Sequence, residues 1–225
     1  MEKSLKLEPT KNSLQKNPHT ISSLNCKRSR VSLNFFNKSQ SNNKIILEQH
    51  NHFIEALKSP DTRETAFKKL LADYKERLYW HIRKIVIDHD DADDALQNTF
   101  IKVFEKIDTF KGNSGIYTWM YRIATNEALN LLGKKSKQLG VSNEEWIEKQ
   151  TEKLESDVYF EGDVIELKLQ RAIATLPEKQ RLVFNMRYFE EMKYEKMAEI
   201  LETSVGGLKA SYHHAVSKIK SRINE

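Results

Sequence analysis

Residues 111–137, KGNSGIYTWMYRIATNEALNLLGKKSK, gather side chains that could bind an unpaired nucleic-acid strand. A glycine-bracketed loop carries Asn113 and Ser114, which can hydrogen-bond the edge of an extruded base. Tyr117 and Trp119 follow, and an aromatic ring that stacks on a base contributes about 1–3 kcal/mol. The lysines at the end of the stretch can hold phosphates. The combination favours unpaired DNA over duplex DNA, although each aromatic residue taken singly is more simply a half-buried core position.

A second group of polar side chains lies in a predicted helix-turn-helix. The segments KYEKMAEIL and VGGLKASYHHAVSKIKSRI read as two helices joined by a tight turn, the second long and basic. Small residues near the start of the second helix allow it to approach a groove, and polar side chains beyond them can reach phosphates or base edges. The candidates are Ser204, Lys209, Ser211, His213, His214 and Lys218.

An ordinary helical hairpin with its polar residues in water explains the same pattern, so this motif by itself leaves DNA binding open. Ser204 stands at the N-cap position of the second helix in either case. His213 and His214 are adjacent, and adjacent helical positions point about 100° apart, so the two imidazoles cannot chelate one metal ion well.

The elements that position both motifs are predicted to be helices. The chain has only seven glycines and four prolines, and alternating strand patterns are hard to find. Apolar residues recur at i, i+3 and i+4 from Phe67 to Ile85 and again from Ala92 to Ile107. The aspartates of DHDDADD lie before and within the first turn of the second of these helices, where the helix dipole favours negative charge. We therefore expect an all-α fold.

The distribution of charge predicts the domain organisation. Residues 1–44 hold nine basic and two acidic residues and few large apolar ones, so we expect a disordered basic tail. Residues 139–166 hold nine acidic and two basic residues, and we expect a flexible acidic linker over residues 139–163. Two small helical domains flank that linker, at residues 45–138 and 164–225. Charge sorted into blocks commonly meets nucleic acid.

Other features of the composition restrict the class of protein. Cys26 is the only cysteine, so neither an internal disulfide nor a CxxC zinc pair can form, which fits a reducing cytoplasm. We found no signal-peptide h-region, and no apolar run approaches the roughly 20 residues that cross a bilayer. We therefore expect a cytoplasmic protein without membrane insertion.

A metal-dependent nuclease is one alternative, since HNH occurs at residues 50–52 and DHDDADD could hold a divalent ion. The aspartates lack the D-x-D-x-D-G spacing of a calcium loop, and the histidines have no strand-rich context. We expect no catalytic residue, no metal and no cofactor.

Two segments, in this order and at this separation, resemble bacterial sigma factors. DADDALQNTFIKVFEKIDTFKGNSGIYTWMYRIATNEALNLL resembles their second conserved region, and LPEKQRLVFNMRYFEEMKYEKMAEILETSVGGLKASYHHAVSKIKSRI resembles their fourth. The chain has no room for a third region between them, so it is similar to the small extracytoplasmic-function (ECF) group. The resemblance covers about residues 50–222.

The resemblance implies a protein that directs the RNA polymerase core to promoters and helps to open the strands, without bond chemistry of its own. It places contacts to the −10 element at Lys111, Asn113, Ser114, Tyr117, Trp119, Arg122, Asn126, Lys134 and Lys135. It places the −35 contacts on the helix-turn-helix residues given above. The implied docking face for the clamp helices of the β′ subunit is Asp93, Asp94, Gln97, Phe100, Val103 and Phe104. An anti-sigma protein is a further implied partner.

The chain departs from the family pattern at several positions. Glu202 stands in the turn of the helix-turn-helix where a glycine is usual, and Ser211 and His214 occupy positions often held by arginine. The acidic linker suits a positively charged channel of the polymerase. Two alternatives stay open: a helix-turn-helix regulator that binds duplex DNA without polymerase, and a helical interaction module with no DNA role.

Overall fold

Helices build the fold in the part of the chain that the computed structural model describes, residues 51–112, 114–156 and 164–224. Residues 51–58 are helical and precede α2 (Arg63–Val86), α3 (His89–Lys106), the short 3-10 helix η2 (Ile107–Thr109) and α4 (Ile116–Gln138). The all-α prediction is confirmed. The basic tail expected over residues 1–44 lies outside the described residues.

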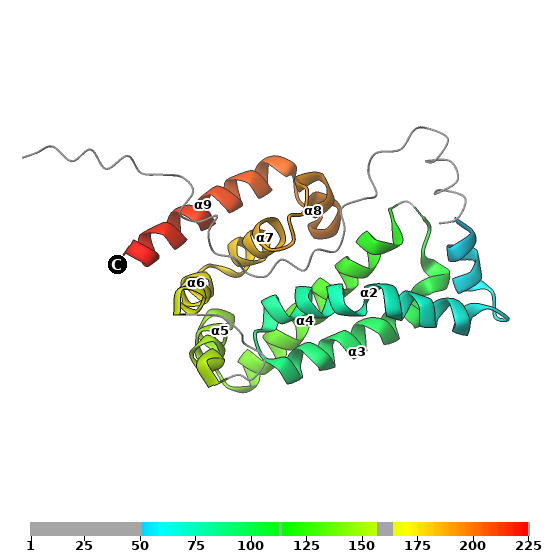
Figure 1. The fold of residues 1–225 in the computed structure, drawn as a ribbon, viewed down its shortest axis with the longest axis horizontal. Coiled ribbons are helices and arrows are strands. Elements are labelled where there is room, and N and C mark those ends of the chain that lie inside the picture. The colour runs from blue at the N-terminus through cyan, green and yellow to red at the C-terminus, as the bar shows by residue number, and fades with distance from the viewer. Residues whose placement is uncertain (1–50, 113, 157–163, 225) are drawn as a thin grey trace, which may run out of the picture. The chain divides into compact units, whose positions relative to one another are not determined.

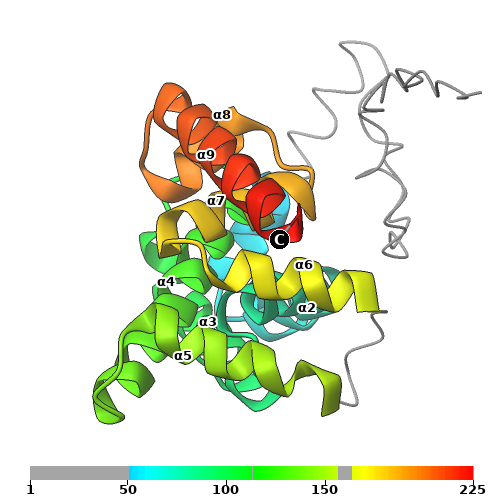
Figure 2. The ribbon, with the colours of Figure 1, turned by 90° about the vertical axis from the view of Figure 1, so that its left-hand side faces the viewer.

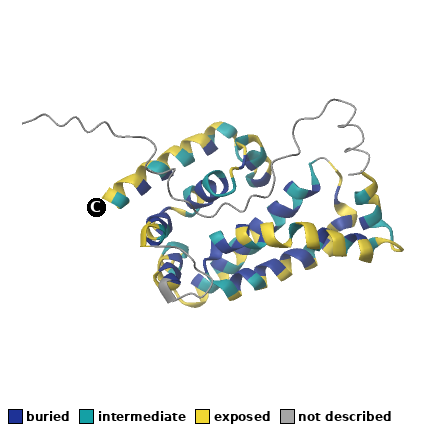
Figure 3. Ribbon diagram, in the orientation of Figure 1, coloured by how far each residue is buried: buried dark blue, intermediate teal, exposed yellow. Residues whose placement is uncertain are grey.

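Helices α2, α3 and α4 pack side by side and form the first half of the fold (Figure 1). Ile87 ends α2 with a φ of 69°, and Asp88 then caps α3 by accepting a 3.0 Å hydrogen bond from the backbone N–H of Asp91. Buried residues line the faces on which the three helices meet (Figure 3), among them Leu78, Ile82 and Met120. This is the amphipathic pattern that the sequence predicts.

The segment expected to be a flexible linker contains α5 (Asn143–Glu152) and the 3-10 helix η3 (Lys153–Ser156). Ser142 and Glu145 form a capping box at its start: Glu145 N–H donates to Ser142 Oγ at 3.1 Å, and Ser142 N–H donates to Glu145 Oε2 at 2.8 Å. Ile147 is fully buried in a cluster with Leu132 and Leu167. Residues 143–156 are therefore helical rather than flexible. Burial of the short apolar face of α5 stabilises this helix, and the acidic residues lie around that face. Residues 157–163 of the expected linker lie outside the described residues.

The second half of the fold consists of α6 (Val164–Ala174), α7 (Glu178–Tyr188), α8 (Tyr194–Leu201) and α9 (Val205–Asn224). In Figure 2, α9 crosses α6 and α7, and it packs against both of them. Between α8 and α9, Glu202 adopts the left-handed conformation, with φ 51° and ψ 42°. Ser204 Oγ accepts a 3.2 Å hydrogen bond from Gly207 N–H and so caps α9, as predicted. Helices α8 and α9 thus form the predicted helix-turn-helix.

The two halves share one apolar core in this structure. The described residues belong to a single compact unit, and one cluster of buried side chains joins Leu78 and Met120 of the first half to Val183, Met186 and Met197 of the second. Among the helices described, none is long and apolar enough to cross a membrane.

Candidate nucleic-acid interface

The loop that could capture a base lies at the N-terminus of α4. Gly112 has a φ of 73°, which a glycine adopts without strain, and Gly115 is the N-cap of the helix. Lys111 is exposed and Ser114 is half-buried. Asn113 lies outside the described residues. No side chain caps the first N–H groups of α4, and free N–H groups at a helix N-terminus favour an anionic ligand.

The aromatic rings of α4 pack against other side chains of the protein more than the sequence suggests. Tyr117 is half-buried beside Tyr121, with ring centroids 4.3 Å apart, and Arg77 lies over its ring at 4.8 Å while donating a 3.3 Å hydrogen bond to its hydroxyl. Burial raises the pKa of Tyr117. Trp119 packs against Phe110 at 5.1 Å. Both rings therefore have protein contacts that a stacked base would have to share or replace.

Arg122, another of the predicted −10 contacts, contacts the second half of the fold. Its Nη2 donates to the backbone carbonyl of Glu199, and its Nη1 lies 2.9 Å from Oε1 of Glu202. Asn126, one turn further along α4, is exposed. No local pattern predicts that Arg122 and the turn of the helix-turn-helix meet, because they are far apart in the chain.

The two lysines near the end of α4 differ in environment. Lys134 is exposed, whereas Lys135 forms an ion pair with Asp91 of α3, which is buried. Burial raises the pKa of Asp91, although Lys135 opposes that rise. Lys134 is free to face a phosphate, but Lys135 has a structural partner.

The predicted −35 residues lie along the outer face of α9. Lys209, His213, His214 and Lys218 are exposed, and Ser211 is half-buried. The opposite stripe packs inward through Leu208, Ala215 and Ile219. Among the described residues, no group of three or more histidine, cysteine, aspartate or glutamate side chains could hold a metal ion.

The predicted docking face is only partly available to a partner. Asp94, Gln97 and Phe104 are exposed, and Asp93 is half-buried. Phe100 is 8% exposed and Val103 is fully buried, so Val103 supports the core rather than a docking surface. The expectation that Val103 faces a partner fails because it lies on the inner side of the α3 stripe.

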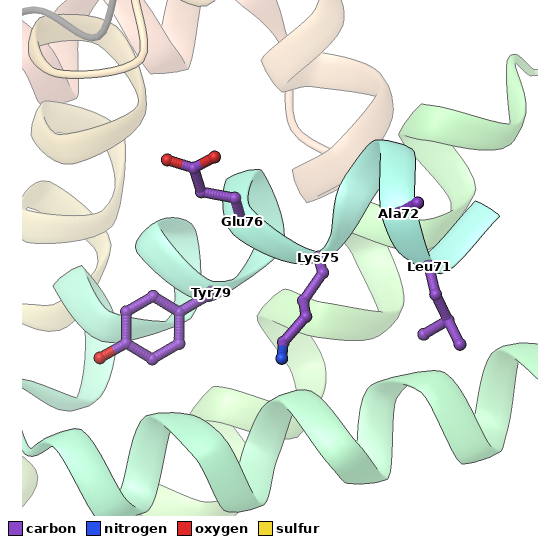
Figure 4. Close-up of a pocket in the computed structure, with 5 residues that line it drawn as sticks. All are labelled: Leu71, Ala72, Lys75, Glu76 and Tyr79. Carbon is purple, nitrogen blue, oxygen red and sulfur yellow. The ribbon is translucent and has the colours of Figure 1, made fainter. Parts of the chain in front are cut away.

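A hollow between α2 and α3 extends this face in a way that the sequence analysis missed. It is lined by Phe67, Leu71, Lys75, Leu96, Gln97, Phe100, Ile101, Phe104 and Glu105. An adjoining hollow lies along α2, where Leu71, Lys75 and Tyr79 point to one side of the helix and Glu76 to the other (Figure 4). Ile101 is 54% exposed at its edge. The spacing of four between residues 71, 75 and 79 is the signal that could have revealed the contribution of α2.

Known proteins match both halves of the chain. Residues 70–138 match the family model described as Sigma-70 region 2, and residues 166–219 match Sigma-70, region 4. The RNA polymerase sigma-H factor of Pseudomonas aeruginosa is 32% identical over 184 residues, which are 76% of this chain and 92% of that protein. The chain belongs to the ECF group of the sigma-70 family.

A further relative of this sigma factor carries the ECF name, and a solved structure shares its fold. The ECF RNA polymerase sigma factor SigW of Bacillus subtilis is 28% identical over 170 residues, covering 72% of this chain and 91% of that protein. The structure of CnrH in complex with the cytosolic domain of CnrY has the same fold, with a TM-score of 0.56, 20% identity, and coverage of 76% of this chain and 96% of that one. The sigma factor serves promoter-specific initiation of transcription, and none of these matches supports a polymerase-independent regulator.

Proposed function

We propose that this sigma factor divides promoter recognition between α4 and α9. The loop at Lys111–Ile116 and the exposed Asn126 and Lys134 bind the unpaired −10 strand, and the outer face of α9 reads the −35 duplex. The observation that supports this most directly is the helix-turn-helix, whose second helix presents polar side chains outward on a stable apolar base. The ends of α4 add an uncapped N-terminus and a free lysine.

The energies of the two DNA contacts fit this division. Extruding a base costs a few kcal/mol, and one stacking contact with pocket hydrogen bonds returns a similar amount. Capture can therefore balance strand opening without any bond chemistry, as expected of a protein that is not an enzyme. Two weak DNA contacts on one chain gain by effective concentration once a partner fixes their spacing.

We propose that the partner that fixes this spacing is the RNA polymerase core, and that its β′ clamp helices occupy the hollow between α2 and α3. Ile101 and Phe104 expose apolar surface there, while Asp94 and Gln97 add polar groups beside it. Apolar side chains at the centre of a patch with polar groups at its rim are typical of a protein interface. The function places the protein in the cytoplasm.

We also propose an anti-sigma partner. One structural relative, the sigma factor RpoE from Bartonella quintana, is described in complex with the anti-sigma factor NepR. Another, CnrH, is described in complex with the cytosolic domain of CnrY. A protein that covers the hollow between α2 and α3 would compete with the polymerase for the same apolar side chains.

Co-elution with core RNA polymerase, followed by run-off transcription on genomic fragments of the source organism, tests the proposed function. Ser114→Ala and Asn113→Ala are expected to weaken the permanganate signal of the open promoter more than duplex binding. Lys209→Ala and His213→Ala are expected to weaken selection of the upstream element in gel shifts with altered promoters. Lys149→Ala, which removes a positive charge from an exposed position of α5, is the control. Absence of both co-elution and transcripts would contradict the proposal.

A further inference from the structure

We propose that Arg77 of α2 is a positioning residue for −10 recognition, because it fixes the ring of Tyr117 for stacking on an extruded base. This inference rests on the proposed −10 role of α4 and extends the site to a second helix. Helices α2 and α4 pack side by side, so a side chain of α2 can reach the first turn of α4 (Figure 1). Arg77 precedes Tyr117 by 40 positions in the chain, and no local pattern links the two residues.

Two contacts join Arg77 to Tyr117. The guanidinium carbon lies 4.8 Å from the centre of the Tyr117 ring, within the roughly 6 Å over which an aromatic face attracts a cation. Nη2 of Arg77 also donates a 3.3 Å hydrogen bond to the Tyr117 hydroxyl. The contact over the ring limits its tilt, and the contact to the hydroxyl fixes the direction in which the ring points. Together they restrict the motions that would misalign the ring with a base.

The backbone from which Arg77 extends is attached to α4 as well. The Tyr121 hydroxyl donates a 3.4 Å hydrogen bond to the backbone carbonyl of Arg77. Burial raises the pKa of Tyr121, so this hydroxyl keeps its proton and remains a donor. Leu78, the next residue of α2, is fully buried. Arg77 therefore projects from a fixed point of the fold, as a residue must if it is to position another side chain.

The charge of Arg77 has no competing partner. Arg77 is exposed, and its guanidinium takes part in no ion pair with another described residue. A long exposed side chain loses rotamer freedom when it is held in one place, so an arginine without any partner would sample many orientations. A planar guanidinium also stacks well on an aromatic face. Tyr117 is thus the side chain that orders Arg77, and Arg77 in turn orders the ring.

Tyr117 is well placed for this control to affect base capture. It directly follows Ile116, the buried last residue of the loop Lys111–Ile116. Its ring is half-buried, with Tyr121 at 4.3 Å and Tyr74 of α2 at 6.2 Å between ring centroids. A base therefore meets only the part of the ring that these neighbours leave uncovered. A ring that is already fixed loses less freedom when the base arrives, which favours binding.

A direct phosphate contact is the competing role for Arg77. A guanidinium has five N–H donors, and the hydrogen bond to Tyr117 uses one of them. A phosphate contact would act independently of the ring. It would also change the slope of log affinity against log salt concentration by about 0.7 for a single strand. Positioning acts only through Tyr117 and leaves that slope unchanged, so the two roles can be separated.

A double-mutant cycle with the complete holoenzyme tests the positioning role. Permanganate reactivity gives the fraction of open promoter on a template that the parent protein transcribes. Arg77→Ala is expected to lower the equilibrium constant for strand opening by about five- to tenfold, the size of one cation–π contact and one hydrogen bond. Tyr117→Leu should lower it at least as much. Adding Arg77→Ala to Tyr117→Leu should cause no further loss, and Arg77→Ala should keep the salt slope of the parent.

Lys68→Ala is the matched control, since it removes one positive charge from an exposed position of α2 that pairs with Glu64. It should leave strand opening unchanged. Thermal unfolding establishes that each variant is folded. Tyr117→Phe, which keeps the ring and removes only the hydroxyl, gives a second cycle in which Arg77→Ala should cause a smaller loss than in the parent.

Three results would overturn the positioning role of Arg77. These are strand opening by Arg77→Ala that equals the control, losses that multiply in the double variant, and a salt slope reduced by Arg77→Ala. Failure of the parent protein to co-elute with core polymerase or to support run-off transcription would instead contradict the proposed function.

Discussion

The ammonium group of Lys135, near the end of α4, forms an ion pair with the carboxylate of Asp91, which is buried in the first turn of α3. Asp91 is 2% exposed, whereas the Lys135 side chain is 37% exposed. The buried Asp91 carboxylate therefore needs the ion pair more than the partly solvated Lys135 does. Lys135, which the sequence analysis predicted to contact DNA, instead links α4 to α3.

Removing one partner or the other should lower the free energy of unfolding by unequal amounts. Lys135→Met leaves the buried carboxylate unpaired and is expected to lower the free energy of unfolding by about 1–2 kcal/mol. Asp91→Asn removes the carboxylate whose pKa burial raises, and it leaves a lysine that water can solvate. This substitution should therefore lower the free energy of unfolding by less than about 1 kcal/mol. Urea unfolding measures both, with Lys134→Met as the exposed control. Equal losses for both substitutions would contradict this asymmetry.

The packing of α5 predicts that the acidic segment is a folded element. Ile147 is fully buried, and Ile147→Ala should lower the free energy of unfolding by about 2–4 kcal/mol because it leaves a cavity. Glu148→Ala, at the exposed neighbouring position, should change it by less than about 0.5 kcal/mol. Hydrogen exchange of the α5 amides would report the same difference locally. A tether without packing would show neither effect.

The strain at Glu202 can be measured by comparing two substitutions. Glu202→Ala and Glu202→Gly both remove the carboxylate from Arg122, but only glycine relaxes the left-handed backbone. Glu202→Gly should therefore be more stable than Glu202→Ala by about 1 kcal/mol in thermal unfolding. If the alanine variant equals the glycine variant, the turn is not strained at this position.

The Glu190 carboxylate should make stability depend on pH in the acid range. Burial by itself would raise the pKa of Glu190, but His81, with Lys84 and Arg77 further away, lowers it below the ordinary 4.5. Since the folded pKa is lower than the unfolded one, this contribution is present above pH 4.5 and disappears as the pH falls through the folded value. Unfolding measured from pH 6 to about pH 3 should show a slope that Glu190→Gln reduces and Glu195→Gln retains.

In the hollow between α2 and α3, substitutions of exposed and of buried residues should affect different properties: the first polymerase binding, the second stability. Ile101→Ser changes an exposed apolar side chain, so it should weaken co-elution with core polymerase while leaving thermal unfolding almost unchanged. Val103→Ala, two residues further on, is expected to lower the free energy of unfolding by about 2 kcal/mol because Val103 is fully buried. A stable Val103→Ala protein that loses polymerase binding would contradict this assignment.

Local patterns in the sequence were sufficient for much of the fold. The stripes from Phe67 to Ile85 and from Ala92 to Ile107 predicted α2 and α3, since helical periodicity depends only on near neighbours. Ser204 predicted the start of α9 for the same reason. The acidic segment was harder to predict. Its only local signs of a helix were a capping box and the apolar Ile147, and its high acidic content favoured a flexible linker instead.

For the site, the sequence by itself determined which side chains could contact DNA and that these side chains lie on helices. Residue type decides the first point, and a spacing of three or four decides which residues share one face of a helix. Only the tertiary structure decided which of them are available. Val103 lies inward, Lys135 is paired with Asp91, and Arg122 is held by Glu202 across 80 positions of chain. Such pairings depend on how separate helices pack, and that packing is set by the combined burial of many distant residues.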